Sequence, residues 1–107
     1  MSDSSIHTGD DGTVYLGGEL NFVSTPGMYR ELESRFTDHG AIRNIDLAGI
    51  NHADSSGLAL LLEWQAMSNR LHQRLNITNA PANLLRLAKL CEADNLMDIS
   101  GRDNDSM

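Results

Sequence analysis

The feature that most constrains this chain is a polar turn joining a short apolar segment to a leucine-rich one. The apolar segment covers residues 42–47, the turn is Asp-Ser-Ser-Gly at 54–57, and the leucine-rich segment covers 58–64. This order predicts a strand, a helix start and an amphipathic helix. The first N–H groups of a helix lack internal partners, and the helix dipole favours negative charge there. A serine in this turn can cap the helix, bind an anion, act as a nucleophile or be phosphorylated.

Length and composition indicate one small domain with an aliphatic core. The chain has 107 residues, of which 40% are hydrophobic and only 5% aromatic. Its formal net charge of −7 argues against a surface that binds the phosphates of nucleic acid. Cys91 is the single cysteine, so neither an internal disulfide nor a cysteine-based metal site is expected, and a reducing compartment fits.

The termini carry few apolar residues. We expect residues 1–11 to be a flexible lead-in, 12–101 to be the single domain and 102–107 to be a flexible tail. The longest apolar run, residues 58–62, is far shorter than the roughly 20 residues that cross a membrane. The prediction is a cytoplasmic protein, without direct membrane insertion, whose membrane association would come through a partner.

Hydrophobic periodicity and turn residues predict alternating strands and helices. The predicted strands are 13–16, ended by a glycine pair, then 19–23, 42–47, 75–78 and 96–99. The predicted helices are 25–38, 54–72 and 82–92, with Asp54 or Ser55 capping the second. Alternation at this spacing implies right-handed crossovers, and hence an α/β fold with a mostly parallel sheet of four to five strands. In so small a chain, we expect the helices mainly on one face.

The second predicted helix has two apolar faces. One broad stripe, which contains Trp64, is the natural core face. Leu58 and Leu62 lie on another flank, close to Ser55. Two interpretations remain open: rotation of the helix buries both leucines, or they form a docking patch next to the serine.

The chain offers no convincing catalytic constellation. The turn loosely resembles a nucleophile elbow with Ala53 in place of the first glycine, but only His72 follows it, on the same predicted helix. No glycine-rich phosphate loop with a lysine is present. The histidines lack the spacing of metal ligands. They are His7, His39, His52 and His72. We therefore expect a protein that is not an enzyme and holds no metal and no cofactor.

Ser55 thus remains either a cap or a switch. A capping side chain is worth about 1 kcal/mol and only one of Asp54, Ser55 and Ser56 is needed for it. A phosphoryl group on Ser55 would gain from the helix start and be repelled by Asp54. It would also place a charge of about −2 on the flank with Leu58 and Leu62. We expect such a modification to block docking rather than to unfold the domain.

Three motifs resemble those of STAS domains, the fold of the anti-sigma factor antagonists. They are Gly-Glu-Leu at 18–20, Ile-Asp-Leu at 45–47 and Asp-Ser-Ser-Gly-Leu at 54–58. The resemblance covers about residues 13–100 and implies that Ser55 is phosphorylated by an anti-sigma factor kinase, which binds the unmodified form. Asn21 departs from the aspartate usual in the family, which removes one acid near the turn.

A second branch of STAS proteins resembles the chain more closely. Leu-Ala-Leu-Leu-Leu-Glu-Trp at 58–64 and the segment 79–90 are similar to the MlaB-type STAS subunits of phospholipid-transporting ABC complexes, which maintain outer-membrane lipid asymmetry. Such a subunit is not an enzyme but docks on the transporter's ATPase subunit, which keeps it at the inner membrane. The implied partner-binding residues are Tyr29, Ser55, Leu58 and Leu62. The resemblance therefore implies an ATPase partner first, with the anti-sigma factor antagonist switched at Ser55 as the alternative.

Overall fold

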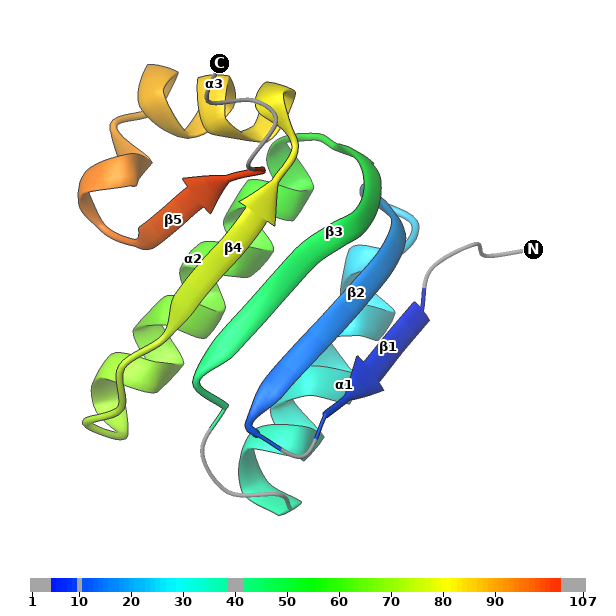
Figure 1. The fold of residues 1–107 in the computed structure, drawn as a ribbon, viewed down its shortest axis with the longest axis vertical. Coiled ribbons are helices and arrows are strands. Elements are labelled where there is room, and N and C mark those ends of the chain that lie inside the picture. Colours follow the sequence, from blue (N-terminus) through cyan, green and yellow to red (C-terminus); the bar gives the residue numbers. More distant parts are fainter. Residues whose placement is uncertain (1–4, 10, 39–41, 103–107) are drawn as a thin grey trace.

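The described part of the chain forms a five-stranded sheet with three α-helices against one face (Figure 1). This computed structural model describes residues 5–9, 11–38 and 42–102. The strands are β1 (Ser5–Thr8), β2 (Thr13–Leu20), β3 (Asn44–Ala53), β4 (Asn76–Ala80) and β5 (Asp98–Gly101). The helices are α1 (Thr25–Asp38), α2 (Ser55–Arg70) and α3 (Ala82–Leu90), followed by the short 3₁₀ helix η1 (Ala93–Asn95).

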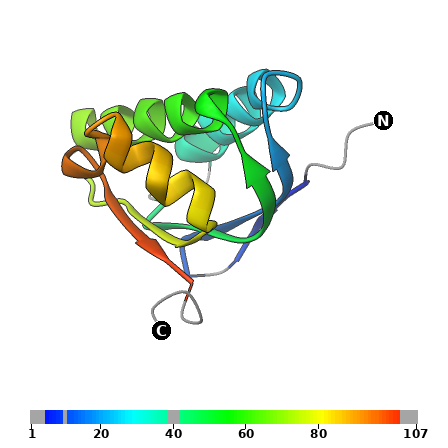
Figure 2. The same cartoon turned by 90° about the horizontal axis from the view of Figure 1, so that it is seen from above.

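The strands lie in the sheet in the order in which they occur along the chain. β1 pairs antiparallel with β2, and every later pair is parallel. Successive right-handed crossovers in one direction place their helices on the same side of the sheet, and Figure 2 shows the helices together above it. The predicted α/β class, the mostly parallel sheet and the one-sided helices are confirmed.

The first two strands differ from the predicted ones. Ser5–Thr8, predicted to be part of a flexible lead-in, instead forms β1 along the outer edge of β2. The glycine pair does not end the next strand, because β2 continues through it to Leu20. The register with β3 shifts on both sides of the pair, and Gly18 has a φ of 96°. Glycine accepts that irregularity without ending the pairing, so the predicted separate strand at 19–23 does not form.

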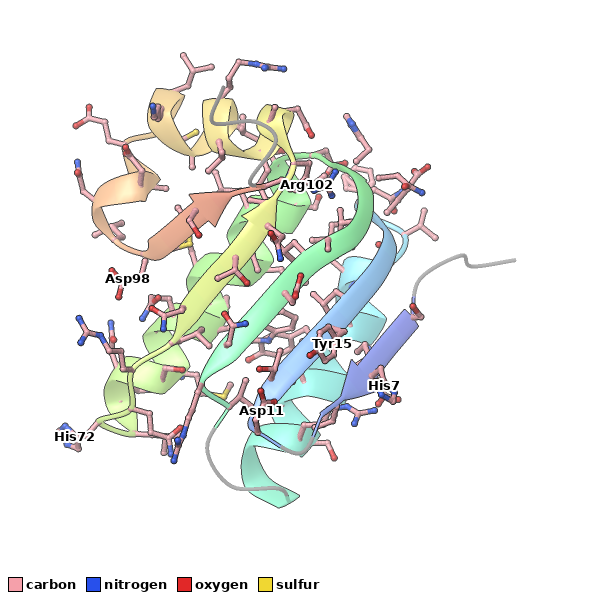
Figure 3. The ribbon with its side chains drawn as sticks, in the orientation of Figure 1. His7, Asp11, Tyr15, His72, Asp98 and Arg102 are labelled. Atoms are coloured by element: carbon pink, nitrogen blue, oxygen red, sulfur yellow. The ribbon has the colours of Figure 1, made fainter. Side chains whose placement is uncertain are left out.

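The end of the described chain also belongs to the fold. Arg102, predicted to begin a flexible tail, donates hydrogen bonds to the backbone carbonyls of Leu47, Ile50 and Asn79. Its guanidinium thereby links the middle of β3 to the last residues of β4. Arg102 is labelled in Figure 3. Residues 103–107 of the predicted tail lie outside the described residues.

The core lies between the sheet and the helices, and α2 is its central element. Trp64 and Leu61 on α2 are fully buried, and the indole N–H of Trp64 has no hydrogen-bond partner among the described residues. The helix packs against β3 and is flanked by α1 and α3. Because it has neighbours on three sides, α2 buries a wide arc of its surface.

Candidate functional site

Two turns leave neighbouring strands at the same edge of the sheet. Leu20 at the end of β2 is in register with Ala53 at the end of β3, and the N–H of Asp54 donates to the Leu20 carbonyl at 3.0 Å. Residues 21–24 continue from Leu20 into α1, and residues 54–57 lead from Ala53 into α2. We call the surface formed by these two turns the two-turn edge.

The second turn is built by the side chain of Asp54. Its Oδ1 accepts hydrogen bonds from the N–H groups of Ser56 at 2.8 Å and Gly57 at 3.4 Å, so Asp54 is the N-cap of α2. Gly57 allows the helix to approach β2 closely, because a Cβ there would lie 2.8 Å from the Cβ of Leu20. Of the two capping residues that the sequence left open, Asp54 is the one used.

Ser55 is the first residue of α2, and its side chain is exposed. Since the cap is supplied by Asp54, the hydroxyl of Ser55 is not needed to close the helix start. Ser56, the next residue, is half-buried. Chemically, Ser55 presents an accessible hydroxyl at the N-terminus of a helix of 16 residues, where added negative charge is favoured by the helix dipole.

The predicted docking residues do not form one surface. Leu58 is 4% exposed and belongs to the core, so it is removed from the candidate docking surface. The reason is the position of α2 between α1 and α3, which buries a flank that one sheet contact alone would leave open. Leu62 and Tyr29 are partly buried against the core and keep part of their surface accessible. Ser55, Leu62 and Tyr29 therefore remain as candidates.

The sequence did not indicate two exposed apolar residues on the first turn. Phe22 is 72% exposed and Val23 84% exposed. They were assigned to a strand, which would have buried alternate side chains. The signal that identifies the turn is Asn21, because Asn commonly bonds its side chain to the backbone two residues on.

The first turn is held by a closed set of hydrogen bonds. The Oδ1 of Asn21 accepts from the N–H groups of Val23 at 2.9 Å and Ser24 at 3.1 Å. The Oγ of Ser24 donates to the Glu19 carbonyl at 2.6 Å and accepts from the Asn21 N–H at 3.0 Å. The Asn21 Nδ2 donates to the Glu19 carboxylate at 3.3 Å. An aspartate at 21 would lose that last donor and bring two carboxylates together, which accounts for asparagine here.

Charge is unevenly distributed around the two-turn edge. Residues 1–29 and 44–69 contain no lysine or arginine, whereas Glu19 lies just before the first turn and Asp54 forms the second. The first basic side chains along the neighbouring helices are Arg30 on α1 and Arg86 on α3, each in the second turn of its helix. The edge is therefore apolar at its exposed tip and acidic at Glu19 and Asp54, while Arg30 and Arg35 line a groove on the α1 side of Val23.

The opposite end of the sheet carries its own polar turn, at Asp11 (Figure 3). The backbone N–H of Thr13 donates to the carboxylate of Asp11 at 3.1 Å. This bond and a second one to the Thr13 side chain hold the pKa of Asp11 below its ordinary value. Asp11 lies far along β2 from the two-turn edge and contributes to the hairpin between β1 and β2, not to the candidate site.

Within residues 5–9, 11–38 and 42–102, no group of three His, Cys, Asp or Glu side chains is placed to hold a metal ion. His7 lies beside Tyr15 with ring centroids 6.2 Å apart, and His39 lies outside the described residues. None of the described helices is both long and apolar enough to span a bilayer.

Comparison with known proteins identifies the family. Residues 6–98 match the family described as "Mlab, STAS domain", and the chain belongs to this family of STAS proteins. No curated protein matches the chain in sequence.

Solved structures share the fold. An anti-sigma factor antagonist described as putative, from Thermotoga maritima, is 17% identical with a TM-score of 0.74, covering 97% of this chain and 91% of that one. An anti-sigma factor antagonist from Mycobacterium paratuberculosis is 20% identical with a TM-score of 0.69, covering 95% and 87%. The antagonist SpoIIAA in its unphosphorylated form is 15% identical with a TM-score of 0.67, covering 96% and 92%. At these identities the likeness concerns the fold alone.

Proposed function

We propose that this chain is a non-catalytic STAS regulator that binds a protein partner through the two-turn edge. The observation that carries the proposal is that Asp54 caps α2 and Ser55 does not. Asp54 caps α2 with its carboxylate, while the neighbouring hydroxyl of Ser55 is exposed. A hydroxyl that the fold does not need, at the accessible start of a helix, is available to a partner or to a modifying enzyme.

Phosphorylation of Ser55 would act as an electrostatic switch. A phosphoryl group there adds a charge of about −2 at a helix start, next to the Asp54 carboxylate. The added charge would lie on the same edge as Phe22 and Val23 and would require any partner to desolvate it. Because Ser55 is outside the core and the cap, the fold would persist while partner binding changed.

The first candidate partner is an anti-sigma factor kinase. Its support is that three of the solved structures sharing the fold are described as anti-sigma factor antagonists, and one of these, SpoIIAA, is known in both unphosphorylated and phosphorylated forms. This evidence favours the alternative in the sequence analysis over its first choice. In this function, Ser55 is the modified residue and the unmodified chain binds the kinase.

The second candidate partner is the ATPase subunit of a phospholipid-transporting ABC complex. The specific support is the description of the matched family, together with the leucine-rich start of α2. In this function the chain stays in the cytoplasm, is held at the inner membrane by its partner and supports transport that maintains outer-membrane lipid asymmetry. Ser55 need not be phosphorylated.

Two purified partners from the same organism distinguish the candidates: the anti-sigma factor kinase and the transporter ATPase subunit. With kinase and ATP, the first candidate predicts about one phosphate per chain on Ser55 by mass spectrometry. Ser55→Ala removes that phosphate, and the matched control Ser56→Ala retains it. Binding to the ATPase, without phosphate on Ser55, supports the second candidate. Binding to neither protein overturns the proposed function.

A further inference from the structure

The two-turn edge exposes an unusual pair of side chains. Phe22 and Val23 stand next to each other at the tip of the first turn, with most of their surface accessible. Large aromatic side chains at the centre of a binding surface commonly contribute most of the binding free energy. Val23 also borders a groove of about 650 Å³ between β1 and α1, whose lining is mixed and includes Arg30, Glu31 and Arg35.

The turn holds this pair in place before any partner arrives. Asn21 and Ser24 fix the backbone on both sides through the hydrogen bonds to Glu19, Val23 and each other. A side chain presented on a fixed backbone loses less conformational entropy on binding than one on a mobile loop. The turn therefore does more than connect β2 to α1: it also lowers the entropic cost of a contact made by Phe22 and Val23.

The charges around the pair indicate the partner's chemistry. Glu19 is exposed in β2 just before the turn, and Asp54 caps the adjacent helix. The two turns contain no lysine or arginine, and the basic side chains beside the pair, Arg30 and Arg35, line the groove on its α1 side. The acidic side formed by Glu19 and Asp54 favours a positively charged partner surface and disfavours an acidic one.

We propose that Phe22 and Val23 are the apolar anchor of the partner-binding surface, and that they enter an apolar pocket edged by lysine or arginine side chains on the partner protein. The inference rests on the proposed function, since it concerns the same edge. It adds the residues that carry the affinity and the chemistry of the surface they meet. Ser55 lies beside this anchor, so a phosphoryl group there would alter its electrostatic surround directly.

The anchor is tested by measuring partner dissociation constants for Phe22→Ala and Val23→Ala in the full chain. Leu96→Ala and Leu90→Ala are matched controls, because these leucines are 65% and 81% exposed on the α3–η1 side. We expect Phe22→Ala to weaken binding about 30-fold or more and Val23→Ala less. The two controls should stay within about twofold. Unchanged urea unfolding of each variant shows that the fold is intact.

The charge of the partner surface is tested by association kinetics. We expect the association rate to fall about tenfold or more from low to high ionic strength. Glu19→Gln, which keeps an oxygen to accept from the Asn21 Nδ2, should slow association at low salt, and Asp94→Asn, at an exposed acid in η1, should leave it unchanged. An association rate that does not respond to salt or to Glu19→Gln overturns the basic pocket.

The outcomes separate this inference from the proposed function. Each variant is measured against whichever of the two purified proteins, kinase or ATPase subunit, binds the wild-type chain. If the wild type binds and Phe22→Ala binds equally well, the anchor is overturned and the proposed function stands. If the wild type binds neither protein, the proposed function fails and this inference fails with it.

Discussion

The two ends of the parallel strands differ in charge as well as in shape. At the carboxyl ends, the two-turn edge exposes Phe22 and the Ser55 hydroxyl among acidic residues. At the amino ends, Arg43 and Arg74 line one hollow, and Arg74 forms an ion pair of 3.8 Å with Asp98. The two ends thus differ in basic residues, which are absent from the two turns and present at the amino ends beside Asp11 and Asp98.

The two ends also differ in how their exposed apolar residues are supported. Leu71, 47% exposed at the C-terminal end of α2, follows an ordinary helix end. Phe22 and Val23 instead lie on a turn whose side chains bond one another. Exposure alone therefore does not mark a site. An exposed apolar side chain is a better sign of a binding site when hydrogen bonds hold its backbone in place and the fold does not otherwise need those bonds.

The largest expected effect compares the leucines at the two ends of α2. Leu58→Ala should lower the free energy of unfolding by about 2–5 kcal/mol, because it opens a cavity in the core. Leu71→Ala should change it by about 0.5 kcal/mol, since half of that side chain is already in water. Urea denaturation measures both. Equal losses would contradict the assignment of Leu58 to the core.

A second comparison concerns two glycines, one at each end. Gly57→Ala should cost about 1–3 kcal/mol because the added Cβ meets Leu20. Gly12→Ala should cost about 1–2 kcal/mol because Gly12 has a φ of 85°. Asparagine and alanine should rank oppositely at the two sites. Gly12→Asn should lower the free energy of unfolding less than Gly12→Ala, and Gly57→Asn should lower it more than Gly57→Ala. Thermal unfolding of the four variants tests this, and a common order at both sites would refute it.

A smaller effect separates the cap from its neighbour. Asp54→Ala should lower the free energy of unfolding by about 1 kcal/mol, since it leaves the Ser56 N–H without its acceptor. Ser55→Ala should leave the free energy of unfolding within about 0.5 kcal/mol of the wild type. Chemical denaturation of the two variants provides the measurement. If Ser55→Ala proved the more destabilising, Ser55 would be structural and its role as a free hydroxyl would fail.

The smallest expected effect lies at the amino ends, in the pH dependence of stability. The pKa of Asp11 is lower in the folded chain than its ordinary value of 3.8, because the Thr13 N–H and hydroxyl bond to the charged form. Its contribution is therefore present above about pH 3.8 and is lost as pH falls through the lowered pKa. Asp11→Asn should narrow the stability difference between neutral and acidic pH. Urea midpoints across pH 2–7 that match those of the wild type would contradict this.

Much of the fold was predictable because α2 and α3 bury leucines at helical spacing, and turns separate them from β4. β1 was not predictable from the sequence, because it is four residues long and has Ile6 as its single large apolar residue. Its pairing comes from backbone hydrogen bonds to β2, which leave little trace in side-chain type.

The candidate site was predictable only in part. The helix start at 54–57 is a local signal, so a cap at Asp54 or Ser55 follows from the sequence, whereas the choice of Asp54 comes from the structure. The burial of Leu58 depends on α1 and α3 flanking α2, which no single helix pattern contains. Phe22 and Val23 were missed because two apolar residues after β2 also fit an extended strand. The bonds from Asn21 that form the turn are local, so Asn21 itself is the signal that distinguishes the turn from a strand.

The buried indole of Trp64 makes the protein its own optical reporter. As the single tryptophan of the chain, fully enclosed between α2 and the sheet, it dominates the intrinsic fluorescence and is screened from any partner at the surface. A partner that only touches Phe22 and Ser55 should leave the emission wavelength unchanged. With a partner that lacks tryptophan, a shift on binding would mean that the surroundings of Trp64 had changed, so one spectrum separates rigid docking from rearrangement of the core.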